Sequence, residues 1–124
     1  MSLMHFKQLW ANHVVQKDLP KILSLYDKNF IFRGTFAKNT TSNRTQLQKY
    51  FKGFSKDVNK VVFLKNSSLI KNKDTYIDNG KYNFHTSEGG VIKAEYQFVF
   101  KKKNEKDFKI ISHFSFLIKW SILY

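Results

Sequence analysis

The residues best suited to acid–base chemistry lie near the end of the chain. His113 follows a predicted turn near Glu105, and Gln97 and Glu95 precede that turn. If the turn sets the register of a hairpin, Gln97 lies opposite His113, and Glu95 lies opposite Ser115 and diagonal to His113. A carboxylate beside an imidazole fixes its tautomer and raises its basicity, as a general base requires. The more common alternative is a buried structural histidine that hydrogen-bonds to Gln97 or to a carbonyl group.

Aromatic residues from separate parts of the chain are candidates for a ligand pocket. They are Trp10, Tyr26, Tyr50 and Tyr82, with Gln97 and Ser115 as polar companions. Such rings would accept a flat apolar molecule, and the phenol hydroxyls would orient a carbonyl group on it. Rings of this kind also fill ordinary protein cores, so both interpretations stay open.

The remaining chemistry-bearing residues form no known metal-binding or nucleophilic pattern. The histidines are His5, His13, His85 and His113, and their spacing matches no set of metal ligands. The sequence has no Gly-rich phosphate loop and no serine in a nucleophile elbow. We therefore expect no metal, no other cofactor and no covalent catalysis.

The spacing of apolar residues predicts three helices followed by a sheet. Helical periodicity covers 4–16, a short segment capped by Asp18, and a segment that begins after Asn43 and ends near residue 56. A short extended segment at 29–36 precedes the third helix. Beyond residue 60 the period changes to two, which predicts strands near 61–67, 75–85, 91–102 and 108–119. Gly80 is expected to form a bulge where the sheet bends.

Length and composition indicate one globular domain over 1–124. The chain has 124 residues, 42% of them apolar, and 13 phenylalanines. Residues 1–3 resemble the remnant of an expression tag. No apolar run approaches the roughly 20 residues of a membrane-spanning helix. Because cysteine is also absent, the sequence favours a cytoplasmic protein without a membrane partner.

The formal net charge of +13 raises the question of nucleic-acid binding. It comes from 22 Lys and Arg against 9 Asp and Glu, and Arg33 and Arg44 are the only arginines. Recognition of nucleic acid favours the bidentate guanidinium, and the lysines are scattered along the whole chain. We therefore expect no nucleic-acid partner, and we give anionic ligands or surfaces somewhat more weight.

The last predicted strand is apolar on both faces. One face carries Ile110, Phe114 and Phe116, and the other carries Ile111, His113, Ser115 and Leu117. A strand buried on both sides needs two covers, and the helices supply one. The simplest second cover is the sheet of another copy, which predicts a homodimer through the outer face of the sheet. The apolar ending at 117–124 supports this prediction.

The chain resembles the NTF2-like superfamily over nearly its whole length. The residues that carry the resemblance are Trp10-Ala11, Asp18, Leu25-Tyr26, Gly34-Thr35, Arg44, Tyr50-Phe51, Asp78, Gly80, Tyr82, 94–100 and 111–115. The nearest branch contains the association domain of calcium/calmodulin-dependent protein kinase II (CaMKII) and small SnoaL-like bacterial proteins. The resemblance implies an α+β, cystatin-like cone in which three N-terminal helices pack on a strongly curved, mostly antiparallel sheet. It also implies a dimer and a pocket between helices and sheet.

The resemblance marks a fold more than a chemistry. The kinase association domain has arginines that reach its pocket from the final strands, whereas the corresponding strands of this chain contain none. Glu95 also stands where related sequences often carry Arg. We therefore expect neither a carboxylate-binding arginine cage nor assembly into large rings.

Three functions remain as hypotheses. The first is binding of a small, largely apolar molecule without turnover. The second is a cofactor-free isomerase or lyase of the SnoaL or ketosteroid isomerase type, in which His113 or Asp78 moves a proton and Tyr50 or Tyr82 polarises a carbonyl. Beside Asn79-Gly80, Asp78 is also typical of a turn or bulge. The third is an oligomerisation or protein-interaction module that resembles the kinase association domain.

Overall fold

The computed structural model describes residues 1–65 and 67–122, and it contains the three expected helices. They are α1 (Leu3–Gln16), α2 (Leu19–Ser24) and α3 (Arg44–Phe54), followed by a short 3-10 turn, η1 (Ser55–Asp57). Ser2, Asp18 and Asn43 cap the helices, because each side chain accepts a backbone N–H of the first turn. The caps predicted at Asp18 and Asn43 are therefore confirmed.

Six strands form one sheet. They are β1 (Tyr26–Arg33), β2 (Val58–Phe63), β3 (Ser68–Asn72), β4 (Thr75–Thr86), β5 (Gly90–Asn104) and β6 (Asp107–Ile122). Their order is β1-β6-β5-β4-β2, and β3 also pairs with β4. All pairs are antiparallel except β1 and β6. The single strand expected near 61–67 is wrong, because β2 and β3 are separate strands that pair with successive parts of β4.

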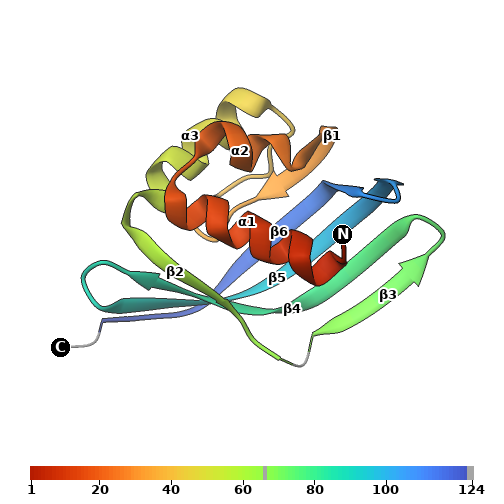
Figure 1. The fold of residues 1–124 in the computed structure, drawn as a ribbon. Helices are drawn as coiled ribbons and strands as arrows, with labels where there is room; N and C mark the ends of the chain where they lie inside the picture. Colours follow the sequence, from red (N-terminus) through yellow and green to blue (C-terminus); the bar gives the residue numbers. More distant parts are fainter. Residues whose placement is uncertain (66, 123–124) are drawn as a thin grey trace.

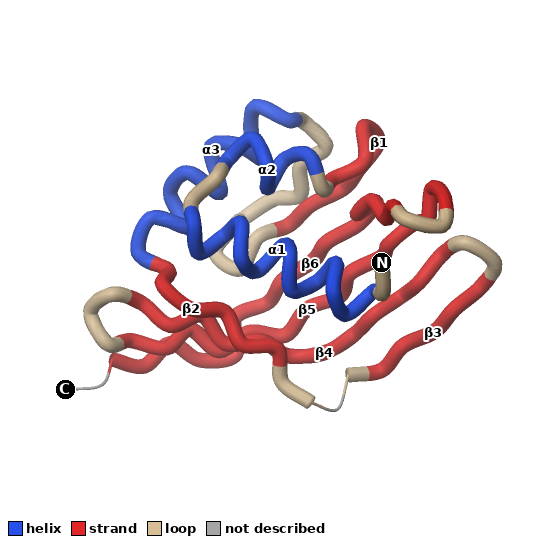
Figure 2. The backbone as a smooth tube through the Cα atoms, in the orientation of Figure 1, coloured by secondary structure: helices blue, strands red, loops and turns tan. Residues whose placement is uncertain are grey.

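The helices cover one face of the curved sheet. α1 lies across the long strands, and α2 and α3 lie beside it toward β1 (Figure 1). The tube view shows the same arrangement, with the opposite face of the sheet left open (Figure 2). This architecture confirms the predicted α+β class, with helices on one face of a mostly antiparallel sheet. Within residues 1–65 and 67–122, none of the helices has both the length and the apolar character that a membrane span requires.

Aromatic side chains fill the space between the helices and the sheet. The rings that are at most 2% exposed are Phe6, Trp10, Tyr26, Phe32, Phe51, Tyr82, Phe84, Tyr96, Phe98 and Phe100. Trp10 lies among them, stacked on Tyr82 and edge to face with Phe51 and Phe98. Ring pairs of this kind stabilise a core beyond the area that they bury. Polar atoms on these rings are therefore held in fixed positions.

An extra residue in β6 changes the register of the β5–β6 hairpin. Phe100 pairs with Ile110, as the turn predicts, but the preceding residue Val99 pairs with Ser112. Ile111 therefore has no counterpart on β5. This β-bulge moves residues 112–117 of β6 by one position relative to β5 and so exchanges the faces of that part of the strand. A second register shift follows between Leu117 and Lys119.

The predicted pairing around His113 is wrong for this reason. His113 does not lie opposite Gln97, and Ser115 does not lie opposite Glu95. His113 and Ser115 are buried under the helices. Glu95 and Gln97 are exposed, and they belong to the opposite face of the sheet.

The outer face of β6 carries exposed apolar side chains. Phe116, which pairs with Glu95, is 51% exposed, and Phe114, which pairs with Gln97, is half-buried. Ile110, which was expected on the same face as Phe116, is instead buried in the core because of the bulge. Residues 123 and 124 of the apolar ending lie outside the described residues.

Candidate functional site

Four buried side chains form a hydrogen-bonded row through the core. Nε1 of Trp10 on α1 lies 3.2 Å from Oη of Tyr26 on β1, and this oxygen lies 2.9 Å from Nδ1 of His113 on β6. Nε2 of His113 lies 3.0 Å from Oη of Tyr82 on β4. All four residues are at most 2% exposed. We call this row, Trp10–Tyr26–His113–Tyr82, the buried hydrogen-bond chain.

Trp10 determines the direction of this chain. An indole N–H only donates, so the Tyr26 oxygen accepts from it. If Nδ1 of His113 also donated to Tyr26, the buried Tyr26 proton would lack an acceptor among the described residues, which is costly. The Tyr26 hydroxyl therefore donates to Nδ1, and Nε2 carries the imidazole proton and donates it to Tyr82. The Tyr82 hydroxyl proton is left for a neighbouring acceptor.

Burial keeps every member of the chain neutral. It lowers the pKa of His113 to about 3, and it raises the pKa of Tyr26 and of Tyr82 well above the usual value for a phenol. The hydroxyl of Ser115 partly offsets the rise in the pKa of Tyr82. At neutral pH His113 is thus a weak base, and it serves to orient hydrogen bonds more than to remove protons.

A small cavity lies beside Tyr82, and we call it the inner cavity. Its polar lining consists of Thr35, Tyr50, Tyr82, His113 and Ser115, and the rings of Trp10, Phe32, Phe51, Phe54 and Phe84 enclose it. The hydroxyl oxygens of Thr35 and Ser115 are 2.7 Å apart. The cavity has a volume of about 10 Å³ for the centre of a water-sized molecule, close to the space that one buried water needs. It therefore suits one very small molecule.

Tyr50 supplies a hydroxyl with no partner. Its Oη is buried and has no hydrogen-bond partner within residues 1–65 and 67–122. Burial raises the pKa of Tyr50 to about 12, and the polar groups of Thr35 and Phe36 near the hydroxyl partly offset the rise, so the hydroxyl keeps its proton at neutral pH. Gly34 makes room for this ring, because a Cβ at that position would collide with Tyr50. An unpaired buried donor beside a cavity calls for an explanation, and a ligand oxygen would satisfy it.

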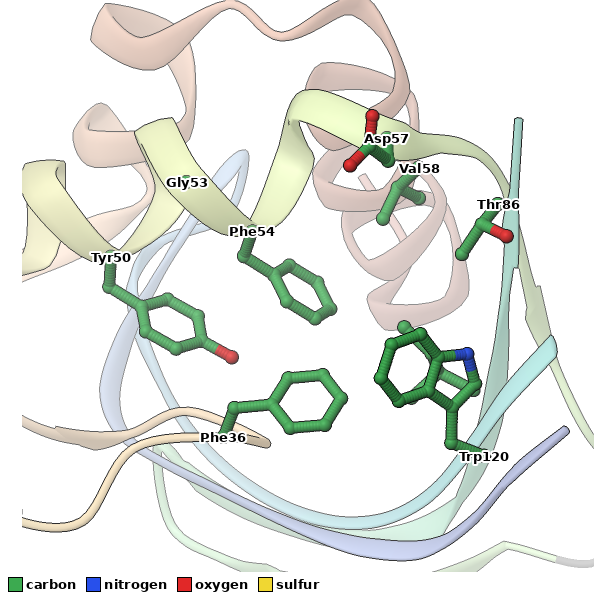
Figure 3. A pocket seen from close by; sticks show the side chains of 9 residues that line it. Phe36, Tyr50, Gly53, Phe54, Asp57, Val58, Thr86 and Trp120 are labelled. Atoms are coloured by element: carbon green, nitrogen blue, oxygen red, sulfur yellow. The ribbon is translucent and has the colours of Figure 1, made fainter. Parts of the chain in front are cut away.

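A larger pocket opens next to the inner cavity, and we call it the outer pocket. Tyr50 and Phe54 line both spaces and stack on each other at 5.4 Å. Figure 3 shows the rings of Tyr50, Phe54, Phe36 and Trp120 around one space, with Asp57 at its edge. The volume is about 400 Å³, which is in the range of small-molecule sites.

The structure brings most of the predicted site residues together. Trp10, Tyr26, Tyr50, Tyr82, His113 and Ser115 belong to the buried hydrogen-bond chain or line the inner cavity. Tyr26 is connected to the inner cavity by its hydrogen bond to His113, whereas the other five residues line the cavity. Glu95 and Gln97 do not reach this region, because the bulge at Ile111 places them on the opposite face.

Asp78 lies in a separate ionic cluster. Its Oδ2 is 2.7 Å from Nζ of Lys7 and accepts a hydrogen bond from Oη of Tyr96 at 3.2 Å. Lys7 also lies over the rings of Phe63 and Tyr96. The bulge expected at Gly80 is wrong, because β4 and β5 pair without a register shift there. A Cβ at Gly80 would come within 2.6 Å of the Tyr96 hydroxyl, so this glycine makes room for the cluster.

Thr35 is a cavity residue that the sequence did not single out for chemistry. It follows β1, and an isolated bridge between Phe32 and Thr41 closes the loop that carries it. The Gly34-Thr35 pair contributed to the family resemblance, but no spacing pattern connects Thr35 with Ser115, 80 residues further on. Trp120 and Asp57 of the outer pocket were missed for the same reason.

The polar side chains of the site are arranged for hydrogen bonding to a small molecule. In the part of the chain that the structure describes, no group of three or more His, Cys, Asp or Glu side chains is arranged to hold a metal ion. Both nitrogens of His113 are engaged by phenols. The inner cavity presents hydroxyl groups, which can hold a water molecule or the oxygens of a small carbonyl or carboxylate compound.

Comparisons with known proteins add a family and a fold. Residues 21–117 match the family described as metal-independent carbonic anhydrase. No curated protein sequence matches the chain.

Solved structures share its fold at low sequence identity. A proposed calcium/calmodulin dependent protein kinase II association domain from Xanthomonas campestris has a TM-score of 0.79 and 22% identity, over 90% of this chain and 81% of that one. A proposed ketosteroid isomerase from Parabacteroides distasonis has a TM-score of 0.74 and 15% identity, over 94% and 86%. A proposed NTF2-like dehydratase from Streptomyces avermitilis has a TM-score of 0.76 and 11% identity, over 94% of each chain. These similarities confirm the NTF2-like fold that the resemblance implies, and at such identities they concern the fold alone.

Proposed function

The chain belongs to the metal-independent carbonic anhydrase family, and we propose that it interconverts carbon dioxide and bicarbonate in the inner cavity. One observation carries this proposal. The buried hydrogen-bond chain leaves the Tyr82 hydroxyl proton available beside a cavity that suits one very small molecule. The reaction needs such a site, because its substrate has only three heavy atoms and carries no group for tight binding.

The lining of the inner cavity matches both reactants. Aromatic walls favour the apolar carbon dioxide molecule, and the hydroxyls of Tyr50, Tyr82, Thr35 and Ser115 would meet the oxygens of bicarbonate. Bicarbonate, and carbon dioxide together with the attacking water, need more room than one water molecule. We expect the Tyr50 side chain to move and make this room, because its hydroxyl makes no hydrogen bond of ordinary length and angle within residues 1–65 and 67–122. The net charge of +13 also attracts an anion such as bicarbonate.

In the hydration direction, a water molecule held by Thr35 and Ser115 attacks the carbon of carbon dioxide. A C–O bond forms, one C=O electron pair moves onto oxygen, and the water loses a proton to a base in solution. Tyr82 and Tyr50 donate hydrogen bonds to the oxygen that gains charge, and preorganised donors of this kind are a large source of catalysis. His113 stays neutral and holds Tyr82 in orientation.

Stopped-flow hydration of carbon dioxide, followed with a pH indicator on chelator-dialysed protein, tests the proposal. We expect a rate above the uncatalysed one, and a fall of about 100-fold for Tyr82→Phe. Tyr76→Phe is the matched control, because it removes another phenol of β4 whose ring packs on Phe108, outside the site. Absence of catalysis by the unmodified protein would contradict the proposed function.

A second candidate function is binding of a small, largely apolar molecule in the outer pocket. Its aromatic lining and its volume of about 400 Å³ favour this role. An isomerase or lyase of the ketosteroid isomerase type is less well supported, because Asp78 and Glu95 both lie away from the inner cavity. Native mass spectrometry of the purified protein would reveal a retained ligand as a discrete mass adduct.

We also propose a homodimer through the outer face of the sheet. Phe116 is 51% exposed there, and Ile31 on the neighbouring strand β1 is 41% exposed. Covering such side chains is favourable. The same native spectra report the mass of the assembly, and Phe116→Lys should shift it from dimer to monomer. A monomer in the unmodified protein would contradict this proposal.

A further inference from the structure

The proposed reaction releases a proton, and the buried hydrogen-bond chain cannot carry it to solvent. A proton passed from Tyr82 through His113 would reach Tyr26, whose remaining partner is the indole N–H of Trp10. This group only donates, so the transfer stops there. Trp10 and Tyr26 are each 1% exposed. The proton must therefore leave through another wall of the inner cavity, and Tyr50 and Phe54 form the wall that the inner cavity shares with the outer pocket.

The outer pocket combines flat aromatic walls with one carboxylate. The ring of Phe36 lies 5.9 Å from that of Trp120 and 6.3 Å from that of Phe54. Asp57 is the acidic residue of the lining, and Figure 3 shows it at the edge of the space that these rings surround. Aromatic faces attract flat rings and cations, and a carboxylate accepts an N–H and stabilises positive charge on the ring that carries it. The combination matches a planar nitrogen heterocycle.

We propose that the outer pocket binds a small planar nitrogen base of the imidazole type, which accepts the proton of the hydration reaction. This inference rests on the proposed function. In the step, the new C–O bond of bicarbonate forms, one O–H bond of water breaks, and an N–H bond forms on the base: CO2 + H2O + imidazole gives bicarbonate and imidazolium. Asp57 accepts the other N–H of the ring and stabilises the cation. The net charge of +13 then favours release of the cation into solution.

Binding can be measured without any catalytic assay, because Trp120 lines the pocket and is 56% exposed, whereas Trp10 is buried. Imidazole titrated into the protein should change the Trp120 fluorescence in a saturable way, with an affinity on the order of millimolar for so small a ligand. Asp57→Asn should weaken binding by about fivefold. Glu105→Gln, which removes the same charge from the distant β5–β6 turn, should leave the affinity unchanged. Trp120→Phe should abolish the signal.

A response that does not saturate, or one that Asp57→Asn leaves unchanged, would overturn the site. The kinetic measurement addresses its role. The hydration rate should rise with imidazole and saturate at the concentrations that saturate the fluorescence, and a non-aromatic buffer of similar basicity should give no saturation. Saturable binding with no effect on the rate would overturn the role as proton acceptor. Absence of hydration in every buffer would instead overturn the proposed function and leave the measured binding intact.

Discussion

The sheet buries a carboxylate, Asp78, and an imidazole, His113, in two different kinds of surroundings. Asp78 forms an ion pair, because Nζ of Lys7 lies 2.7 Å from its carboxylate, and Tyr96 donates a hydrogen bond to the same oxygen. His113 is kept neutral between two phenols, because burial lowers its pKa to about 3. Both residues are 2% exposed. In the ion pair, each charge is compensated by its partner. The buried hydrogen-bond chain is neutral, and it ends at the inner cavity with the Tyr82 hydroxyl, which can donate a hydrogen bond there.

This difference separates a structural group from a candidate catalytic one. A buried carboxylate paired with a lysine is poorly suited to proton transfer. Protonation of the carboxylate, or loss of a proton from the lysine, would leave the other group buried with an uncompensated charge. A neutral phenol oriented by an imidazole can donate to a developing oxyanion without such a cost. Asp78 and His113 were expected to be alternative proton carriers. Their neighbours instead give Asp78 a structural role and leave His113 in the candidate catalytic site.

The largest effect should come from breaking the ion pair. Lys7→Met keeps most of the apolar stem but leaves the Asp78 carboxylate buried and unpaired, since the carboxylate is 2% exposed. We expect a loss of about 3–5 kcal/mol in the free energy of unfolding. Urea unfolding measures it. The double variant Lys7→Met/Asp78→Asn should recover much of this loss, and a loss below about 1 kcal/mol for Lys7→Met would show that the pair behaves as an ordinary surface contact.

Removing one phenol from the buried hydrogen-bond chain and one from the ionic cluster of Asp78 should show which of the two regions takes part in catalysis. Tyr26→Phe takes the donor from Nδ1 of His113 and the acceptor from Trp10, so the direction of the buried hydrogen-bond chain is lost. We expect the carbon dioxide hydration rate to fall by about 10- to 100-fold. Tyr96→Phe removes the phenol beside Asp78 and should leave the rate within about twofold, since it lies outside the inner cavity.

A spectroscopic measurement shows whether Tyr26 acts through His113. The ¹⁵N shifts of the His113 ring should identify the Nε2–H tautomer in the unmodified protein and in Tyr96→Phe. Tyr26→Phe should shift the ring toward a mixture of tautomers. If Tyr26→Phe slows the reaction without changing these shifts, its effect does not pass through His113.

The neutral state of His113 also predicts how stability depends on pH. Its pKa in the folded protein is lowered to about 3, whereas an unfolded histidine titrates near 6.5. Below pH 6.5 the unfolded chain therefore binds more protons than the folded one, so the free energy of unfolding falls as pH falls toward 3. From pH 7 to pH 5 the loss should be about 2 kcal/mol. His113→Phe should remove this part of the dependence.

The pKa of His13 is also lowered, by burial and by Lys21. A residual loss of stability with falling pH is therefore expected in His113→Phe, and the difference between the two proteins is the quantity to compare. Denaturant unfolding at a series of pH values measures it. Identical pH dependence in both proteins would mean that His113 has the same pKa in the folded and the unfolded protein.

Much of the fold follows from local patterns in the sequence. The caps at Asp18 and Asn43 and the change of period near residue 60 depend on neighbouring residues, and they locate the helices and the start of the sheet. The register of β5 and β6 does not follow in this way. The bulge at Ile111 reflects packing across the whole sheet, and a single inserted residue exchanges the faces on which Glu95 and His113 were expected to meet.

The candidate site was also predictable only in part, because some of its residues can be named from residue type and others depend on contacts between distant parts of the chain. The buried aromatic residues and His113 could be named from residue type alone, because few other groups on apolar strands can do chemistry. Thr35 could not, since its position depends on a loop held by the bridge between Phe32 and Thr41. The pairing of Asp78 with Lys7 joins residues 71 positions apart, and no local pattern indicates that separation.

The smallest effect compares two glycines in different surroundings. Gly34 faces the Tyr50 ring, which a Cβ would strike, whereas a Cβ on Gly53 of α3 meets no atom within 4 Å. Gly34→Ala should lower the free energy of unfolding by about 1 kcal/mol or more through overpacking, and it should slow carbon dioxide hydration by displacing Tyr50. Gly53→Ala should instead stabilise the helix by about 0.5–1 kcal/mol. If Gly34→Ala leaves the hydration rate unchanged, the Tyr50 hydroxyl makes no contact with the reacting molecule, and Tyr82 acts on it without that second donor.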